Sequence, residues 1–356
     1  MTDDDPVSVR RARAADADAV AAFTRDTWGE RHGDYVPEAF PRWVEADDPD
    51  RRTFVVTLPP AAVADAVEGD PAADPNLVDG RRVVGCIQGV LLSEWEAWGQ
   101  AIRVDPAARG FGVSRHLSRA VFDWGRERGA TVCRNMVFSW NVAGLGQSRA
   151  VGFDPCTEFR FLQPVPDAEA TPDLPVAGTG SGTAGAPDPD AAWSFWTDSA
   201  AREHLRGLSM DAEESWALSA LTREELAAAA ADDRLLAVHD GGVAGMSYRS
   251  YTHEREAGDG ETDGQTDDGA DAETITEAIY GVAAWRDAEA AAALLAGIAR
   301  DAAAAGADRT RVLVPEAAAV VSDAAAARVP VADEPDFVMA ADLTDPAVGR
   351  IPDGDA

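Results

Sequence analysis

Lysine is entirely absent from this 356-residue sequence, so arginine supplies nearly all of its positive charge. Its 31 basic residues face 63 acidic ones, which gives a formal net charge of −32 and an isoelectric point near 4.3. Such a surface repels nucleic acid and anionic membranes, so we expect neither as a partner. A disordered acidic tail does not explain the charge, because 46% of the residues are hydrophobic and the acids are spread over both halves.

The acidity favours instead a cytoplasmic protein from an extreme halophile. In molar salt the Debye length falls to about 3 Å, so neighbouring carboxylates barely repel one another and can keep the surface hydrated. The preference for Arg, Ala, Gly and Asp also fits a GC-rich genome. Codon usage therefore accounts for part of the missing lysine.

Cysteine is scarce as well. Cys86, Cys133 and Cys156 are too few and too scattered for a disulfide framework, and they lack metal-ligand spacing, so we predict no metal site. We expect each to be a small core residue. The chain begins Met-Thr-Asp-Asp-Asp, unlike a secretory signal, and no apolar run reaches membrane length. These features predict an intracellular chain without a membrane span.

The most informative stretch lies at residues 101–129. Alternating Ile102 and Val104 predict a strand with one buried face. Gly110 and Gly112 follow, and apolar residues then recur at helical spacing. Glycine lets the backbone approach a ligand closely, and a helix N-terminus offers unpaired N–H groups and a positive dipole end. The stretch therefore predicts a strand, a turn and a helix that together hold a phosphate or diphosphate.

This stretch resembles the cofactor turn of the GCN5-related N-acetyltransferases, the GNAT superfamily. In that family a Val-x-Pro strand end precedes Arg/Gln-x-x-Gly-x-Gly/Ala; here residues 104–106 read Val-Asp-Pro and residues 109–114 read Arg-Gly-Phe-Gly-Val-Ser. A second block agrees in register, with Asn-Val-Ala-Gly at 141–144 and Gly-Phe at 152–153. The family places a tyrosine four residues before that Gly-Phe, where this chain has Ser148.

The resemblance implies a mixed α/β fold, with an acetyltransferase domain at residues 1–165. Residues 166–190, rich in Pro, Gly, Ala and Asp, predict a flexible linker. The elements predicted over residues 191–346 repeat the order of the first half, beginning with a strand at 193–196. They favour a second, diverged GNAT-like domain in tandem with the first, followed by a disordered tail at 347–356.

The predicted second domain lacks the cofactor turn. Residues 283–289 read Ala-Ala-Trp-Arg-Asp-Ala-Glu, with no glycine for close approach. Asp287 and Glu289 also place negative charge where a diphosphate would lie. We expect this domain not to bind acetyl-CoA, and either to shape the acceptor pocket or to bury a face of the first domain.

The resemblance implies direct attack of a neutral amine on the thioester of acetyl-CoA, the co-substrate. This reaction needs a placed cofactor, removal of the amine proton and stabilisation of the departing thiolate. The implied cofactor contacts are Ile102, Arg103, Val104, Arg109, Gly110, Phe111, Gly112, Val113, Ser114 and Asn141. Arg109 is equally well explained as a solvated arginine, and Asn141 as a helix N-cap.

The general base is left open by the sequence. Glu94 and Glu96 lie beside the entry to the predicted central strand, where family members often place a carboxylate. Asp26, Glu30 and His32 lie in the predicted acceptor loop and are weaker candidates.

Ser148 occupies the family's general-acid position. An alcohol is a poorer proton donor than a phenol, and a thiol with a pKa of about 8.5 leaves as the thiolate with little help. We therefore expect Ser148 to contact the cofactor or to pack rather than to be an essential acid.

Taken with the resemblance, these patterns predict an N-acetyltransferase that acts on the amine of a small molecule, such as an amino acid. Two alternatives stay open. One is a protein acetyltransferase acting on lysine or an N-terminus, and the other is a non-catalytic acyl-CoA-binding sensor. The oligomeric state does not follow from the sequence.

Overall fold

The computed structural model describes residues 6–25, 27–29, 33–46, 48–63, 74–178, 185–256 and 274–350. Its helices are α1 (Ala17–Thr24), α2 (Val36–Glu45), α3 (Val113–Glu127), α4 (Val142–Ala150), α5 (Pro189–Asp198), α6 (Ala200–His204), α7 (Arg223–Ala231), α8 (Ala288–Ala304) and α9 (Ala318–Ala326). Its strands are β1 (Ser8–Arg11), β2 (Arg51–Leu58), β3 (Leu77–Val78), β4 (Arg81–Leu91), β5 (Glu96–Val104), β6 (Val132–Phe138), β7 (Asp154–Leu162), β8 (Val176–Ala177), β9 (Leu208–Met210), β10 (Leu218–Ala220), β11 (Leu235–His239), β12 (Val243–Glu256), β13 (Thr274–Trp285), β14 (Arg309–Pro315) and β15 (Asp336–Asp342).

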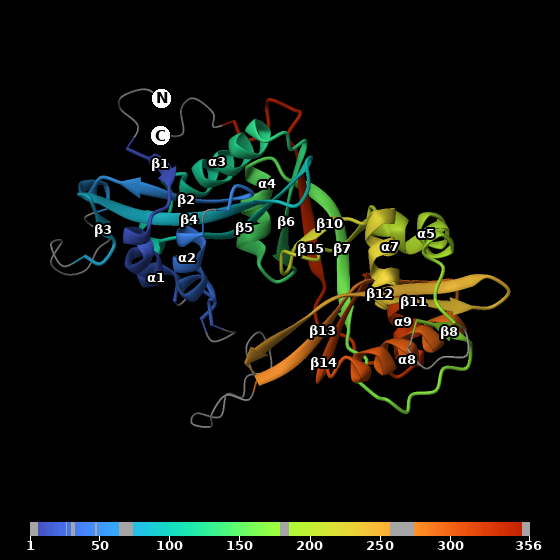
Figure 1. Ribbon diagram of the computed structural model, residues 1–356. Coiled ribbons are helices and arrows are strands. Elements are labelled where there is room, and N and C mark those ends of the chain that lie inside the picture. The colour runs from blue at the N-terminus through green and yellow to red at the C-terminus, as the bar shows by residue number, and fades with distance from the viewer. Residues whose placement is uncertain are drawn as a thin grey trace.

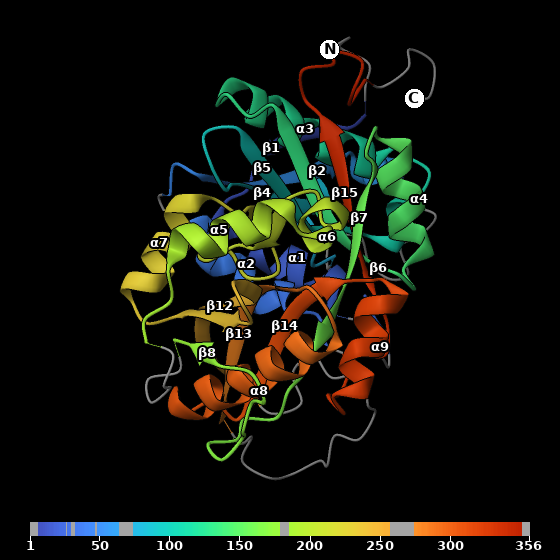
Figure 2. The ribbon, with the colours of Figure 1, turned by 90° about the vertical axis from the view of Figure 1, so that its right-hand side faces the viewer.

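One mixed sheet runs through both halves of the chain. Its strand order is β1-β2-β4-β5-β6-β15-β7-β14-β13-β12-β11-β8, with β3 paired to β4, while β9 and β10 form a separate pair. The last strand, β15, lies antiparallel between β6 and β7, and β7 pairs with β14. Figures 1 and 2 show β15, in red, running beside the green β7 where the two lobes meet. Strands from the two halves therefore alternate at the join, and the predicted mixed α/β fold is confirmed.

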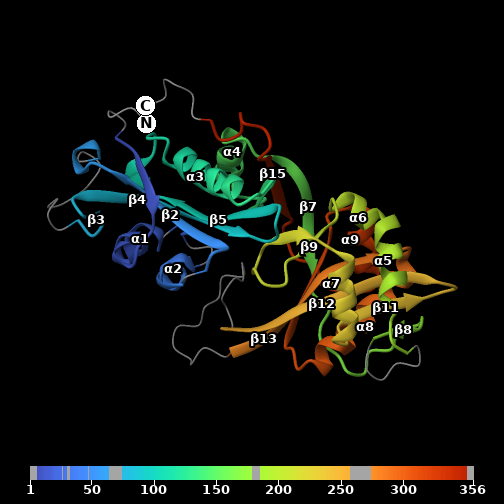
Figure 3. The ribbon, with the colours of Figure 1, turned by 45° about the horizontal axis from the view of Figure 1, so that its top comes forward.

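Helices cover both faces of the sheet in each half. Helix α3 packs on β2, β4 and β5 through Leu117 and Phe122, whereas α1 and α2 cover the opposite face with Val20 and Phe40. Figure 3 shows this arrangement, with α3 and α4 on one side of β5 and α1 and α2 on the other. In the second half α8 lies on one face and α5 and α7 on the other. None of the helices within the described ranges is long and apolar enough to cross a bilayer.

Strands β5 and β6 run parallel but stay paired only briefly. Their pairing spans Glu96 to Trp98 and then stops. Just beyond it β5 carries an extra residue relative to β4, and Ala101 adopts a φ of +54°. Such a bulge bends a strand and increases its twist. The two strands therefore separate towards their C-terminal ends, and the edge of β5 is left facing an open space.

The first element predicted in the second half is wrong. Residues 193–196, predicted as a strand, lie inside α5. Asp188 caps the first turn of this helix, and Pro189 occupies a position where a missing N–H costs nothing. Ala192 and Trp196 are both fully buried, one helical turn apart. Cap and periodicity together outweigh the local β propensity.

The structure describes part of the predicted linker and part of the predicted tail. Within the predicted linker, Val176 and Ala177 form β8 and pair with β11. Most of the predicted tail, residues 351–356, lies outside the described part of the chain.

Candidate active site

The glycine turn after β5 is built for close backbone approach. Gly110 has a φ of +90° and Gly112 a φ of +67°, a region that L side chains rarely adopt. A Cβ at Gly110 would meet no atom within 4 Å, and one at Gly112 would meet only His116, at 3.9 Å. These glycines therefore leave open space instead of making room for a neighbouring part of the chain.

Helix α3 begins directly after this turn. Gly112 is its N-cap residue, and no side chain caps the helix. The first N–H groups, including those of Val113 and Ser114, have no partner within the helix because helical geometry supplies none. They and the positive end of the helix dipole suit a diphosphate. The turn predicted from sequence thus has the conformation that its role requires.

A buried polar cluster holds the start of the turn. The carboxylate of Asp105 accepts hydrogen bonds from the Ala107 backbone (2.9 Å), from Asn76 Nδ2 (2.9 Å) and from Arg82 (3.0 Å). Arg82 also pairs with Asp74. The sequence did not single out Asp74, Asn76 and Arg82, because they lie in or beside the stretch before β4 that is rich in Pro, Ala and Asp.

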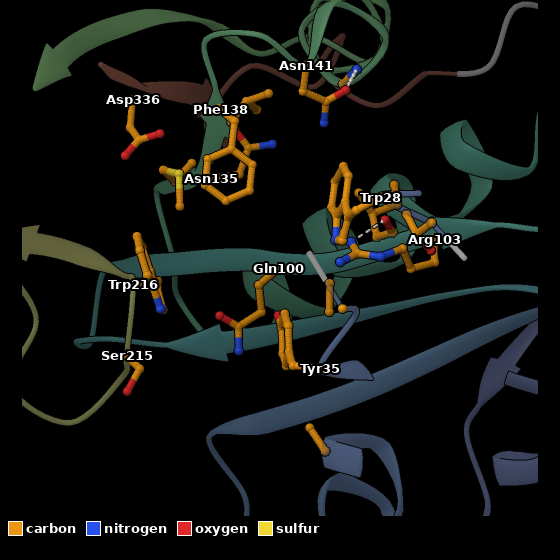
Figure 4. Close-up of a pocket in the computed structure, with 18 of the residues that line it drawn as sticks. Trp28, Tyr35, Gln100, Arg103, Asn135, Phe138, Asn141, Ser215, Trp216 and Asp336 are labelled. Atoms are coloured by element: carbon orange, nitrogen blue, oxygen red, sulfur yellow. Dashed lines mark hydrogen bonds between the residues drawn. The ribbon is translucent and has the colours of Figure 1, made fainter. Parts of the chain in front are cut away.

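A cavity of about 2530 Å³ extends from this turn, along the edge of β5, to the second half of the chain. Its lining includes Arg103 and Val104 of β5, the C-terminal part of β6, and one side of α4. The opposite wall comes from residues 214–216 and from β12 to β15. Figure 4 shows labelled side chains from both halves converging on this space. Its size fits an acyl-CoA arm together with a second substrate.

Two asparagines and a serine lie where α4 meets β6. Asn141 caps α4, its Oδ1 accepting from the Gly144 backbone at 2.9 Å, while the side chain also lines the cavity (Figure 4). Ser148 is buried, and its Oγ accepts from Asn135 Nδ2 at 3.1 Å. Asn135 Oδ1 is buried and has no hydrogen-bond partner among the residues that the structure describes. A buried oxygen that lacks a donor at this position suits a polar group of a bound ligand.

An aromatic cluster of Trp28, Phe138 and Trp140 forms one wall of the cavity. Phe138 and Trp140 stack at 5.2 Å between ring centroids, and Trp28 meets both edge to face at 6.1 and 5.5 Å. The Arg103 guanidinium lies over the Trp28 ring at 4.7 Å and binds the buried carboxylate of Asp34 at 2.6 Å. The side chain of Arg103 therefore fixes this wall, and only its backbone remains for the predicted cofactor contact.

The second half contributes the facing wall. Glu214 accepts a hydrogen bond from Gln100 Nε2 at 2.7 Å and pairs with Arg51, which ties the segment to β5 and β2. Next to it, Trp216 lies under the Arg311 guanidinium at 4.5 Å. These contacts fix residues 214–216 across the cavity from the aromatic cluster (Figure 4).

Asp336, the first residue of β15, lines the cavity near Phe138 and Asn135 (Figure 4). Burial raises the pKa of its carboxyl to about 7; Arg311 and Arg160 act in the opposite sense, and Glu334 adds to the rise. No sequence pattern marked this residue.

The predicted base candidates Glu94 and Glu96 do not reach the cavity. Glu94 is exposed. Glu96 is 2% exposed and accepts hydrogen bonds from Arg134 (2.5 Å), Ser93 (3.0 Å) and the Ala220 backbone (3.1 Å). Its carboxylate is thus committed to a buried ion pair and a contact between the two halves. This placement supports a structural role for Glu96 instead of proton transfer.

One further predicted site residue lies at the cavity, and the positions of three others are not described. Arg109 is exposed at the cavity rim, and Asp26, Glu30 and His32 lie outside the described residues. None of the three cysteines is among the residues that line the cavity. Cys86 and Cys133 are fully buried, which raises the pKa of each to about 12, as befits core residues.

In the second half, side chains of the chain itself occupy the helix start that corresponds to the glycine turn. Asp287 caps α8, its carboxylate accepting from the Ala290 backbone at 2.9 Å, and this bond lowers its pKa. The Trp285 indole at the end of β13 donates to Asp323 of α9 at 2.9 Å. A carboxylate therefore fills the helix N-terminus, and an indole crosses from β13 to α9. Both features favour the expectation that this half binds no acetyl-CoA.

Comparisons with known proteins agree with this geometry. The sequence profile of the Acetyltransferase (GNAT) family matches residues 24–146. A GCN5-related N-acetyltransferase from Sphaerobacter thermophilus has the same fold along nearly its whole length, with 15% identity, a TM-score of 0.54, and coverage of 95% of this chain and 96% of its own.

Two shorter structures each match less than half of this chain. A GCN5-related N-acetyltransferase from Kribbella flavida is 23% identical over 47% of this chain and 90% of its own, with a TM-score of 0.33. A Salmonella typhimurium protein assigned as an acetyltransferase, solved with its cofactor acetyl-CoA, is 18% identical over 44% and 83%, with a TM-score of 0.31. No curated protein sequence matches the chain.

Proposed function

We propose that this chain, whose residues 24–146 match the GNAT family of acetyl-CoA-dependent acetyltransferases, acetylates the amine of a small molecule. The observation that carries the proposal is the wall that the second half places across the cavity. Glu214, Ser215 and Trp216 lie opposite the aromatic cluster and are anchored to β5 and β2. A wall at this position favours a compact acceptor over a lysine on a folded protein surface.

In the proposed complex the chain positions acetyl-CoA mainly through its backbone. The N–H groups of residues 111–114 would hold the diphosphate, and the unpaired edge of β5 would accept the pantetheine arm in the manner of an added strand. Asn141 and Asn135 would supply polar contacts from α4 and β6. Once bound, acetyl-CoA supplies the activated thioester, and the residues around it orient the amine and exclude water.

Replacing Ser148 with alanine is expected to change kcat by less than about threefold. A thiolate with a conjugate-acid pKa of about 8.5 departs without a strong acid, and an alcohol is a weak proton donor. The variant also removes the acceptor for Asn135 Nδ2, so a small rise in the KM for acetyl-CoA is expected. Steady-state kinetics at several acetyl-CoA concentrations separate the two effects, and a fall in kcat of about a hundredfold or more would restore the essential-acid role.

The test of function is coenzyme A release from acetyl-CoA with panels of amino acids, other small amines and peptides. We expect turnover with small amines above the background hydrolysis rate. Turnover with peptides alone would favour a protein acetyltransferase. Tight binding of acetyl-CoA without transfer to any acceptor would favour a sensor. Parallel assays in dilute buffer and in multimolar KCl also test the proposed halophilic, cytoplasmic origin, which predicts higher activity in high salt.

A further inference from the structure

We propose that Asp336, brought into the first half by strand β15, is the general base that removes the proton from the acceptor amine. This inference rests on the proposed acetyl transfer. The second half of the chain would then supply a catalytic residue to the site in the first half.

The register of the sheet places Asp336 at the cavity wall. It pairs with Phe138 at the end of β6 and with Phe159 of β7. Directly opposed residues on antiparallel strands present their side chains to the same face of a sheet. Asp336 therefore shares a face with Phe138, whose ring belongs to the aromatic cluster, and Figure 4 shows its carboxylate directed into the cavity.

The carboxylate of Asp336 also differs from the other buried carboxylates of the cavity in its bonding. It makes no hydrogen bond or ion pair with any residue in the described ranges, although it is largely buried. The other buried or half-buried acids of the lining are all bonded: Asp74 and Asp105 to Arg82, Glu214 to Arg51 and Gln100, and Glu277 to Arg311 and His253. The remaining lining acids, Asp308, Asp333 and Glu334, are exposed.

The environment tunes this carboxyl for proton transfer near neutral pH. Burial raises its pKa from 3.8 to about 7; Arg311 on β14 opposes this rise, Glu334 adds to it, and Arg160 on β7 opposes it more weakly. A rise of this size makes the carboxylate about a thousandfold stronger as a base. A general base works best when its pKa lies near the working pH.

The proposed step begins with an acceptor ammonium in the cavity. The Asp336 carboxylate takes one proton, directly or through one water, and becomes the neutral acid. The freed nitrogen lone pair then attacks the thioester carbonyl carbon, the C–N bond forms, and the C–S bond breaks to release the thiolate. The second proton lost from nitrogen neutralises the thiolate to give coenzyme A, and Asp336 returns its proton to solvent.

The test compares Asp336→Asn with the wild type, with Asp342→Asn as the control, because Asp342 is exposed at the other end of the same strand. We expect kcat/KM for a strongly basic amine to fall by about 10²- to 10⁴-fold in Asp336→Asn and to stay within about twofold in the control. Calorimetric binding of coenzyme A is expected to stay within about threefold in both variants, which shows that the turn and fold are retained.

Two further readouts separate a base from a residue that only shapes the pocket. The wild type is expected to lose kcat/KM below about pH 7 and to level off above it, whereas Asp336→Asn rises about tenfold per pH unit as the free amine accumulates. For a weakly basic acceptor such as hydroxylamine, already neutral at the assay pH, the defect of the variant is expected to shrink to less than about tenfold.

The inference is overturned if Asp336→Asn keeps wild-type turnover, or if its defect is equal for strongly and weakly basic acceptors. It is also overturned if kcat/KM of Asp336→Asn still levels off above about pH 7, as in the wild type, while kcat/KM of His253→Gln does not. Failure of the proposed function looks different, because the wild type itself then transfers acetyl to no acceptor in the panel.

Discussion

Replacing Gly112 with aspartate is expected to reduce the affinity for coenzyme A by at least about a hundredfold, equivalent to about 2.7 kcal/mol. Gly112 lies at the start of α3 with a φ of +67°, and its position has open space where a ligand would lie. A carboxylate there brings negative charge and bulk to the helix N-terminus, where it competes with the diphosphate for the same N–H donors. Isothermal titration calorimetry in multimolar KCl measures the loss.

The matched control for this variant is Gly80→Asp. Gly80 also has a positive φ, +76°, and a Cβ added there would meet no atom within 4 Å, but the residue lies in the turn between β3 and β4 and not at a helix N-terminus. Both changes add the same charge and the same backbone strain, and aspartate tolerates this region better than most residues. We expect Gly80→Asp to bind coenzyme A like the wild type. Equal binding by both variants, or no binding by the folded wild type, would contradict the assignment of the turn.

Replacing Glu96 with glutamine is expected to lower the free energy of unfolding by about 3–5 kcal/mol while kcat stays within about threefold. The change leaves Arg134 largely buried without its counter-ion, and removing one partner of a buried pair has an effect of this size. The Ala220 backbone contact between the halves is weakened as well. Denaturant unfolding measures the stability, and saturating kinetics on folded protein measure kcat.

Glu94→Gln serves as the comparison for Glu96→Gln. Glu94 is exposed and two residues away, so its replacement is expected to change the unfolding free energy by less than about 0.5 kcal/mol. A Glu96→Gln variant with unchanged stability and a kcat reduced about a hundredfold would reverse our interpretation and make Glu96 the base.

The glycine turn could be predicted from the sequence, whereas the general base could not. The conformation of the glycine turn was predictable because it depends on the local backbone: Gly110 and Gly112 adopt positive φ values, and α3 begins at the expected residue. Asn141 was predictable in the same way, since an N-cap is a local feature. The base was not predictable in this way. Glu96 stood at a reasonable position in the sequence, but its partners come from β6 and β10.

The second half shows the same contrast. Asp287 could be read from sequence as a carboxylate at a helix start, and it caps α8. Residues 193–196 were wrongly assigned as a strand, because the buried positions of α5 depend on what packs against that helix.

The sequence by itself determined the glycine turn, the mixed α/β fold and the acidic character of the chain, because each depends on neighbouring residues or on composition. Only the tertiary structure decided that β15 lies between β6 and β7, and that Asp336 therefore faces the cavity beside Phe138. The physical reason is that strand pairing joins segments far apart in the chain. The raised pKa of Asp336 follows from the burial and the charges that this pairing brings to it.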